Sequence, residues 1–216
     1  MVFCSGRIPR EGDSITKTRL EAFSDGVIAI IITIMVLEMK VPHSPDGHSS
    51  SGMSADLTTL RHLMPVFLSY VLSFIYVGIY WNNHHHMLHV VKHVNGPIMW
   101  ANHHLLFWLS LIPFVTHWVG ANHNAPVPTA LYGFVLLMSG FAFIILQRQI
   151  VRSHSDNREL VKAVGADFKG KISILSYLIA IGLAFVNQWV SDAIFVAIAI
   201  LWLVPDRRFA KVAVEG

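Results

Sequence analysis

Long apolar stretches alternate with polar segments along most of the chain. A helix needs about 20 mostly apolar residues to cross a bilayer core that is ~30 Å thick. The stretches near this length are Leu20–Val41, Leu63–Trp81, Ile98–Val119, Val127–Gln147, Ile172–Trp189 and Ser191–Val204. The sixth is the shortest, and Asp192 near its start leaves a short apolar run behind it. The pattern predicts an all-α, polytopic membrane protein with six transmembrane helices per subunit.

The lysines and arginines test this layout independently, because they favour cytoplasmic loops. All 16 of them except Lys40 and Arg61 fall in the predicted N-terminal tail, the second-to-third and fourth-to-fifth connections, and the C-terminal tail. Six spans with both termini in the cytoplasm fit this alternation. We therefore expect a cytoplasmic tail over residues 1–19, a transmembrane domain over 20–204 and a second cytoplasmic tail over 205–216, in a multi-pass protein of the plasma membrane.

The composition agrees with a chain that lies in a lipid bilayer. Hydrophobic residues make up 54% of it and charged residues 13%, against roughly 25% charged residues in an ordinary soluble domain. The small basic excess then serves as an orientation signal, and we expect no nucleic-acid partner. Because Cys4 is the one cysteine, no disulfide can form within the chain.

Two polar segments are expected to connect the spans. Pro42–Arg61 is rich in Ser, Gly and Pro, which predicts a flexible outer loop. Arg152–Lys169 has mixed charge and predicts a cytoplasmic helix or linker. The spans show no internal repeat of the kind found in many transporters.

The first span carries the most informative pattern. Ionisable side chains in or beside a membrane span are costly, so Glu21, Asp25 and Glu38 need an explanation. One interpretation is that Arg19 is an ordinary positive-inside anchor and that Ser24 and Asp25 mark a helix end. The alternative is that these polar residues bind other helices of the same subunit.

Helical geometry separates the polar residues from an apolar stripe. At about 100° per residue, one face of the first helix carries Ile30, Thr33, Ile34 and Leu37. Asp25 lies about 140° and Ser24 about 120° away from Ile30 around the helix axis. The two groups therefore point to different neighbours. The periodicity alone does not decide whether the stripe faces lipid, a packed core or a pore.

Short motifs in the first three spans narrow the choice. Arg19 is followed by Phe23, Ser24 and Asp25, the second span ends in Trp81-x-Asn83-His84-His85, and the third contains Trp100-x-Asn102 and Pro113-Phe114. Together these motifs resemble the signature of the transmembrane protein 175 family, the lysosomal potassium channels, in its bacterial six-helix form. The resemblance covers most of the first 115 residues, and the second half of the chain is similar in hydropathy alone.

The resemblance implies a cation channel that selects potassium over sodium without a re-entrant filter loop. Bacterial members with one six-helix set assemble as homotetramers, in which the first helices meet at the central axis. By position, Ile30 and Leu37 would form the hydrophobic constriction, with Thr33 and Ile34 between them. The motif residues would form a structural clamp, which comprises Arg19, Phe23, Ser24, Asp25, Trp81, Asn83, His84, His85 and Asn102. No cofactor is implied besides the permeant K⁺.

A cluster of histidines supports a different class of protein. Seven of the 13 histidines fall close together, at His84, His85, His86, His89, His93, His103 and His104. Histidine is the commonest metal ligand, so a membrane metalloenzyme of the di-metal oxygenase kind is an alternative. Such an enzyme needs further His-rich segments, which the second half lacks. We expect no catalytic residues and no bound metal; a secondary cation transporter is a further alternative.

Overall fold

The computed structural model describes residues 11–39, 53–89, 91–122, 125–154 and 168–203. All regular structure in these ranges is helical, which confirms the all-α prediction. The helices are α1 (Glu11–Leu37), α2 (Met53–His89), α3 (Gly96–Ser110), α4 (Ile112–Ala121), α5 (Pro126–Ser153), α7 (Phe168–Leu183) and α8 (Gln188–Leu203). With α3 and α4 counted as one broken span, the described helices make the six predicted passes.

Four of these passes are long and apolar enough to cross a bilayer. They are Lys17–Leu37, Leu63–His89, Gly96–Ala121 and Pro126–Ser153, while Gln188–Leu203 is a shorter apolar helix. Helix α7 has 16 residues, so at 1.5 Å per residue it is about 24 Å long. The chain is therefore an integral membrane protein whose last two passes are the shortest.

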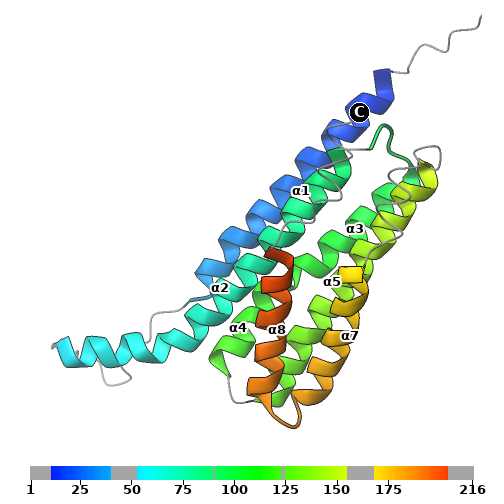
Figure 1. The fold of residues 1–216 in the computed structure, drawn as a ribbon. Coiled ribbons are helices and arrows are strands. Elements are labelled where there is room, and N and C mark those ends of the chain that lie inside the picture. The colour runs from blue at the N-terminus through cyan, green and yellow to red at the C-terminus, as the bar shows by residue number, and fades with distance from the viewer. Residues whose placement is uncertain (1–10, 40–52, 90, 123–124, 155–167, 204–216) are drawn as a thin grey trace, which may run out of the picture.

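The passes run up and down through one bundle (Figure 1). At one end the Lys17 Nζ donates to the backbone oxygen of His89, 3.1 Å away, and the Asn95 amide donates to the Ser153 hydroxyl at 2.7 Å. These contacts place the start of α1, the α2–α3 connection and the end of α5 together. At the other end the His117 Nδ1 lies 2.9 Å from the backbone oxygen of Glu38, at the end of α1.

The third pass is broken where the sequence predicts one continuous helix over Ile98–Val119. Helix α3 ends at Ser110, and Leu111 separates it from α4. Pro113 has no N–H to donate back into the helix, and its ring disfavours the preceding turn, so the break falls just before it. Beyond the break α4 packs closely on α2: a Cβ on Gly120 would lie 2.8 Å from the Cα of Val66.

The second pass starts earlier than predicted. Helix α2 begins at Met53, so the prediction of a flexible loop over Pro42–Arg61 is wrong for its last part. Half of residues 53–60 are good helix formers, namely Met53, Ala55, Leu57 and Leu60, whereas the Gly and Pro residues of this segment all precede them. Residues 40–52 and the predicted linker between 155 and 167 lie outside the described ranges.

The connection between the last two passes also differs from the prediction. The sequence predicts spans over Ile172–Trp189 and Ser191–Val204, but the turn falls over residues 184–187. There the side-chain oxygen of Asn187 accepts from the backbone N–H of Val190, 3.4 Å away, at the start of α8. The turn itself is apolar, with Val186 82% exposed, so hydropathy cannot distinguish it from the helices on either side.

Buried hydroxyl groups connect the helices across the bundle core. Ser73 of α2 and Tyr132 of α5 lie 3.0 Å apart through their hydroxyls, and the Thr116 hydroxyl of α4 is 2.7 Å from that of Ser73. Tyr76 donates to the backbone oxygen of Phe195 in α8 at 2.6 Å. Because lipid offers no competing hydrogen bonds, such contacts help to hold transmembrane helices together.

His154, directly after the last residue of α5, fastens the α2–α3 connection to the bundle. Its Nε2 lies 3.1 Å from the backbone nitrogen of Lys92, and its Nδ1 lies 3.0 Å from the backbone oxygen of Ile150. The ring of His93 stacks on it with the centroids 4.4 Å apart. Nδ1 therefore carries the proton and Nε2 accepts, which is the arrangement of a neutral imidazole.

This geometry predicts acid sensitivity at that end of the bundle. Burial lowers the pKa of His154 from its ordinary value of 6.5, and the hydrogen bond to Ile150 opposes this. The nearby His93, Lys92 and Lys17 lower the pKa further. Because the unfolded chain then takes up the proton more readily, the contribution of His154 to stability is complete above about pH 6.5 and declines below it.

We expect His154→Gln to reduce the loss of thermal stability between about pH 8 and pH 5, because a glutamine oxygen can accept from Lys92 without titrating. The measurement is the unfolding midpoint of purified protein at both pH values. His86→Gln is the matched control, since His86 is an exposed histidine at the same end of α2. An unchanged acid loss in His154→Gln would contradict this assignment.

Candidate functional site

A buried chain of hydrogen bonds joins the first three helices near one end of the bundle. The Asn102 amide nitrogen in α3 donates to the Ser24 hydroxyl oxygen in α1 at 2.8 Å, and Ser24 donates to the backbone oxygen of Leu20 at 2.8 Å. On its other side the Asn102 oxygen lies 2.7 Å from the Nε2 of His84 in α2. Ser24, His84 and Asn102 are all at most 1% exposed.

The direction of each hydrogen bond in this chain can be assigned. The proton of Ser24 goes to its own helix, so its oxygen accepts from the Asn102 amide, which orients the amide. The Asn102 oxygen is then an acceptor, and the His84 Nε2 must donate to it. The His84 Nδ1 is buried without a hydrogen-bond partner among the described residues. We call Ser24, His84 and Asn102 the polar anchor.

Asp25 makes a second contact beside the polar anchor. The indole Nε1 of Trp81 donates to its Oδ1 at 3.0 Å, so α1 and α2 are joined by a charge-assisted hydrogen bond. The Trp81 ring stacks on His85 with the centroids 5.9 Å apart. Phe23 is 51% exposed and stacks on His103 of α3 at 5.5 Å.

The structure does not bring every predicted clamp residue into this network. Arg19 is exposed and lies on the side of α1 that carries the apolar stripe, and within the described ranges no hydrogen bond or ion pair joins it to another residue. His85 is exposed and contributes through ring stacking. The Asn83 amide donates to the backbone oxygen of Ile79 in its own helix at 2.8 Å.

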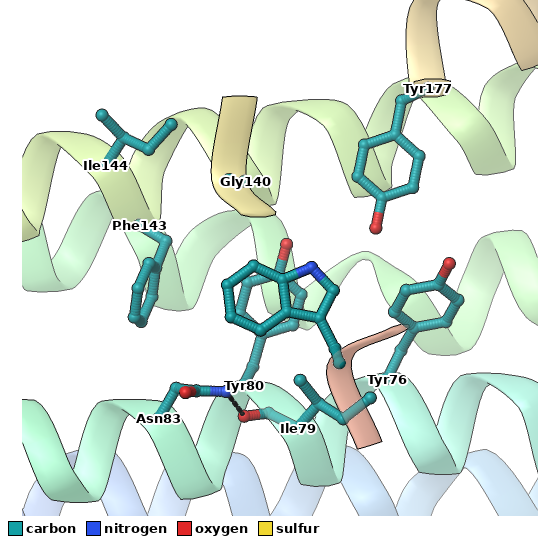
Figure 2. Close-up of a pocket in the computed structure, with 10 residues that line it drawn as sticks. Tyr76, Ile79, Tyr80, Asn83, Gly140, Phe143, Ile144 and Tyr177 are labelled. Carbon is teal, nitrogen blue, oxygen red and sulfur yellow. Dashed lines mark hydrogen bonds between the residues drawn. The ribbon is translucent and has the colours of Figure 1, made fainter. Parts of the chain in front are cut away.

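Asn83 instead lines a small aromatic cavity inside the subunit (Figure 2). The cavity has a volume of about 50 Å³ and lies among α2, α5, α7 and α8. Its polar lining consists mainly of tyrosine hydroxyls, and those of Tyr76 and Tyr177 turn toward the same space in the figure. This cavity was not predicted from the sequence, because its residues are far apart in the chain and each reads as ordinary helix packing.

The predicted apolar stripe lies on the surface of the subunit. Ile30 is 57% exposed, Ile34 41% and Leu37 73%, and Thr33 is exposed between them. The opposite face of α1 is buried against the bundle, with Ile28 and Met35 each 1% exposed. The Thr33 hydroxyl donates to backbone oxygens of its own helix, 3.0 Å from that of Ile30. Helix α1 therefore has one face fixed to its subunit and one face available to something outside it.

Beside the stripe, α1 and the broken third pass form a groove. Its volume is about 410 Å³, and Ile30, Ile34, Phe114 and His117 contribute to its walls. At its end the Nδ1 of His117 lies 3.6 Å from the Glu38 carboxylate as well as 2.9 Å from its backbone oxygen. Sequence reasoning missed this link, although a histidine is a suitable partner for the last carbonyls of a helix.

The clustered histidines are distributed in the structure rather than gathered around one point. His84 belongs to the polar anchor, His104 accepts from the Trp108 indole at 2.9 Å, and His103 lies 2.8 Å from the backbone oxygen of Met99. Among the described residues, no three His, Cys, Asp or Glu side chains are grouped so that they could hold a metal ion.

Taken together, the helical bundle and the exposed stripe on its first helix define a polytopic membrane protein whose first helix turns one face out of the subunit. The family model described as the endosomal/lysosomal potassium channel TMEM175 matches residues 19–113. The range that matches contains the polar anchor and the whole stripe. The chain belongs to the TMEM175 family, whose members are channels and not enzymes.

Individual relatives extend the similarity over nearly the whole chain. A potassium channel of Chryseobacterium sp. (strain P1-3) is 50% identical over 196 residues, covering 91% of this chain and 97% of that protein. A potassium channel of Streptomyces collinus is 31% identical and covers 78% and 82%, respectively. The crystal structure of a lysosomal potassium-selective channel TMEM175 homolog from Chamaesiphon minutus has a TM-score of 0.75 at 28% identity, covering 88% of this chain and 97% of that one.

We expect Asn102→Ala to destabilise the protein, because it leaves the buried His84 Nε2–H without its acceptor and the buried Ser24 oxygen without its donor. Each such group costs about 1–3 kcal/mol. The unfolding midpoint in detergent or nanodiscs measures the loss. Asn122→Ala is the matched control, since Asn122 is exposed and binds a backbone oxygen of its own helix at 3.2 Å. Equal losses in the two variants would argue against the polar anchor.

Proposed function

We propose that this protein is a potassium-selective cation channel of the plasma membrane, active as a homotetramer with four copies of α1 around the pore. The observation that carries the proposal is the two-faced α1, with one face fixed to its subunit and Ile30, Thr33, Ile34 and Leu37 exposed on the other. A cyclic assembly brings four copies of one helix to a common axis. The two bacterial relatives are named as potassium channels, which supports potassium as the permeant ion.

In this proposal the apolar rings of Ile30 and Leu37 form the constriction. Such rings close a pore by steric contact or by excluding water, and a ring of threonine hydroxyls between them offers oxygen atoms to a partly dehydrated ion. The polar anchor and the Asp25–Trp81 contact fix α1 to α2 and α3, so the stripe keeps its direction. Permeant K⁺ is the one ion the mechanism needs, and it needs no bound cofactor.

The proposed orientation places both termini in the cytoplasm. The up-and-down topology places the start of α1, the α2–α3 connection, the end of α5 and the start of α7 on one side of the membrane. Four basic residues of the described ranges lie there, namely Lys17, Lys92, Arg152 and Lys169, whereas Arg61 lies toward the other side. Positive residues favour the cytoplasmic side. In this orientation the polar anchor lies toward the cytoplasm and Leu37 toward the outside.

We expect Ile30→Asn and Leu37→Asn to increase conductance or weaken potassium selectivity, because each adds a hydratable group to an apolar ring. Currents from protein reconstituted in planar bilayers, with potassium and sodium on opposite sides, give both quantities. Val36→Asn is the matched control, since Val36 is 43% exposed and points about 100° away from Leu37.

Unchanged currents in both stripe variants would remove Ile30 and Leu37 from the pore. The same recordings separate a channel from a secondary transporter, because a channel gives unitary currents and a transporter gives coupled flux without them.

We expect Asp25→Ala to reduce the yield of folded tetramer, because it leaves the Trp81 indole nitrogen without its acceptor. Size-exclusion chromatography with light scattering measures the yield. Trp81→Phe should act in the same direction, since it removes the other partner of the same bond. A well-folded Asp25→Ala tetramer with altered permeation would show that Asp25 acts on the ion and not on the fold.

A further inference from the structure

A second, larger groove lies on the other side of the subunit, between α2 and α8. Its volume is about 820 Å³, and most of its lining is apolar, including Met64, Leu68, Leu72 and Val196. Helix α2 bends away from the bundle near its start (Figure 1), and Pro65 lies in this part of the helix. Because Pro65 cannot donate the usual helical hydrogen bond, the bend has a local cause.

Two opposite charges line this groove without binding each other. Asp192, in the second turn of α8, is partly buried, and Arg61 of α2 is exposed. Within the described part of the chain, neither side chain has a hydrogen bond or an ion pair. A carboxylate inside a membrane protein is costly unless a partner compensates its charge. A cation bound beside Asp192 would therefore stabilise the groove.

The position of the groove indicates where in the bilayer this partner lies. Trp189, one turn before Asp192, is 73% exposed, and exposed tryptophans concentrate at the membrane–water interface. The groove therefore starts at the level of the lipid headgroups and continues into the apolar layer. Its charged end, with Arg61 and Asp192, lies at the level of the headgroups, and its apolar walls lie at the level of the acyl chains.

We propose that this groove binds one phospholipid whose headgroup carries a primary ammonium beside its phosphate, the phosphatidylethanolamine class. The phosphate accepts charge-assisted hydrogen bonds from the Arg61 guanidinium, and the ammonium donates to the Asp192 carboxylate. An acyl chain lies along Leu68, Leu72 and Val196. Phosphatidylcholine offers a phosphate and a cation, but its quaternary ammonium has no N–H to donate to Asp192, and phosphatidylglycerol offers a phosphate and no cation. Neither lipid can therefore make both charge-assisted hydrogen bonds.

The test compares these three lipids with matched acyl chains. Delipidated wild-type protein is mixed with each lipid, and native mass spectrometry counts the lipids that remain bound. We expect wild type to retain phosphatidylethanolamine at least about tenfold better than phosphatidylcholine, as a hydrogen bond to a charged group allows. Equal retention of all three lipids would overturn the proposal.

Variants locate the binding. Asp192→Asn should lose the preference for phosphatidylethanolamine over phosphatidylcholine, Arg61→Gln should weaken both, and Val196→Trp should displace both by filling the groove. Arg148→Gln is the control, since Arg148 is an exposed arginine at the opposite end of the bundle, and it should keep the preference. An unaltered preference in Asp192→Asn would overturn the proposal. A disulfide cross-link between two subunits that both carry Val196→Cys would also overturn it, because it would show that a second copy of the chain covers the groove. These outcomes do not depend on which ion the protein conducts.

Discussion

The buried hydrogen bonds among Ser24, Asn102 and His84 are the constraint on which the arrangement of the first three helices depends. In lipid an unpaired polar group has no water to bind, so the buried Asn102 amide is satisfied only where Ser24 of α1 accepts from it and His84 of α2 donates to it. This requirement fixes the rotation of α1 about its own axis. Once Ser24 points to α3, Ile28 and Met35 are directed into the bundle and Ile30 and Leu37 away from it.

Hydropathy and charge predicted the passes well and their ends poorly. Six apolar stretches were enough for the number and order of the passes, because the bilayer imposes a minimum length on each span. The break before Pro113 and the turn at Asn187 were not predicted, because both occur inside apolar sequence, where the mean hydropathy does not change. The start of α2 at Met53 was not predicted, because Ser54, Thr58 and Thr59 continue the polar composition of the Ser- and Gly-rich sequence before it.

The site was partly predictable for a related reason. Local periodicity placed Ile30, Thr33, Ile34 and Leu37 on one face, and the structure exposes that face. The partners of Ser24 and Asp25 lie 78 and 56 positions away in the chain, respectively, so the resemblance to a family was needed to suggest them. Nothing in the sequence indicated that Asn83 binds its own helix while His84, its neighbour in the same motif, binds Asn102 of α3. The link between Glu38 and His117 had no signal in the sequence, because it joins two isolated residues. The same holds for the groove that Arg61 and Asp192 both line.

The hydroxyl of Thr33 has a consequence for what the exposed face of α1 can meet. Its one proton is shared with the backbone oxygens of Ala29 and Ile30, so the outward side of the oxygen carries lone pairs. In the middle of an otherwise apolar stripe, this face is an acceptor and not a donor. An approaching cation or N–H group gains an electrostatic contact there, while an anion finds no hydrogen to bind. The hydrogen bonding of Thr33 within its own helix therefore makes the middle of the stripe electronegative.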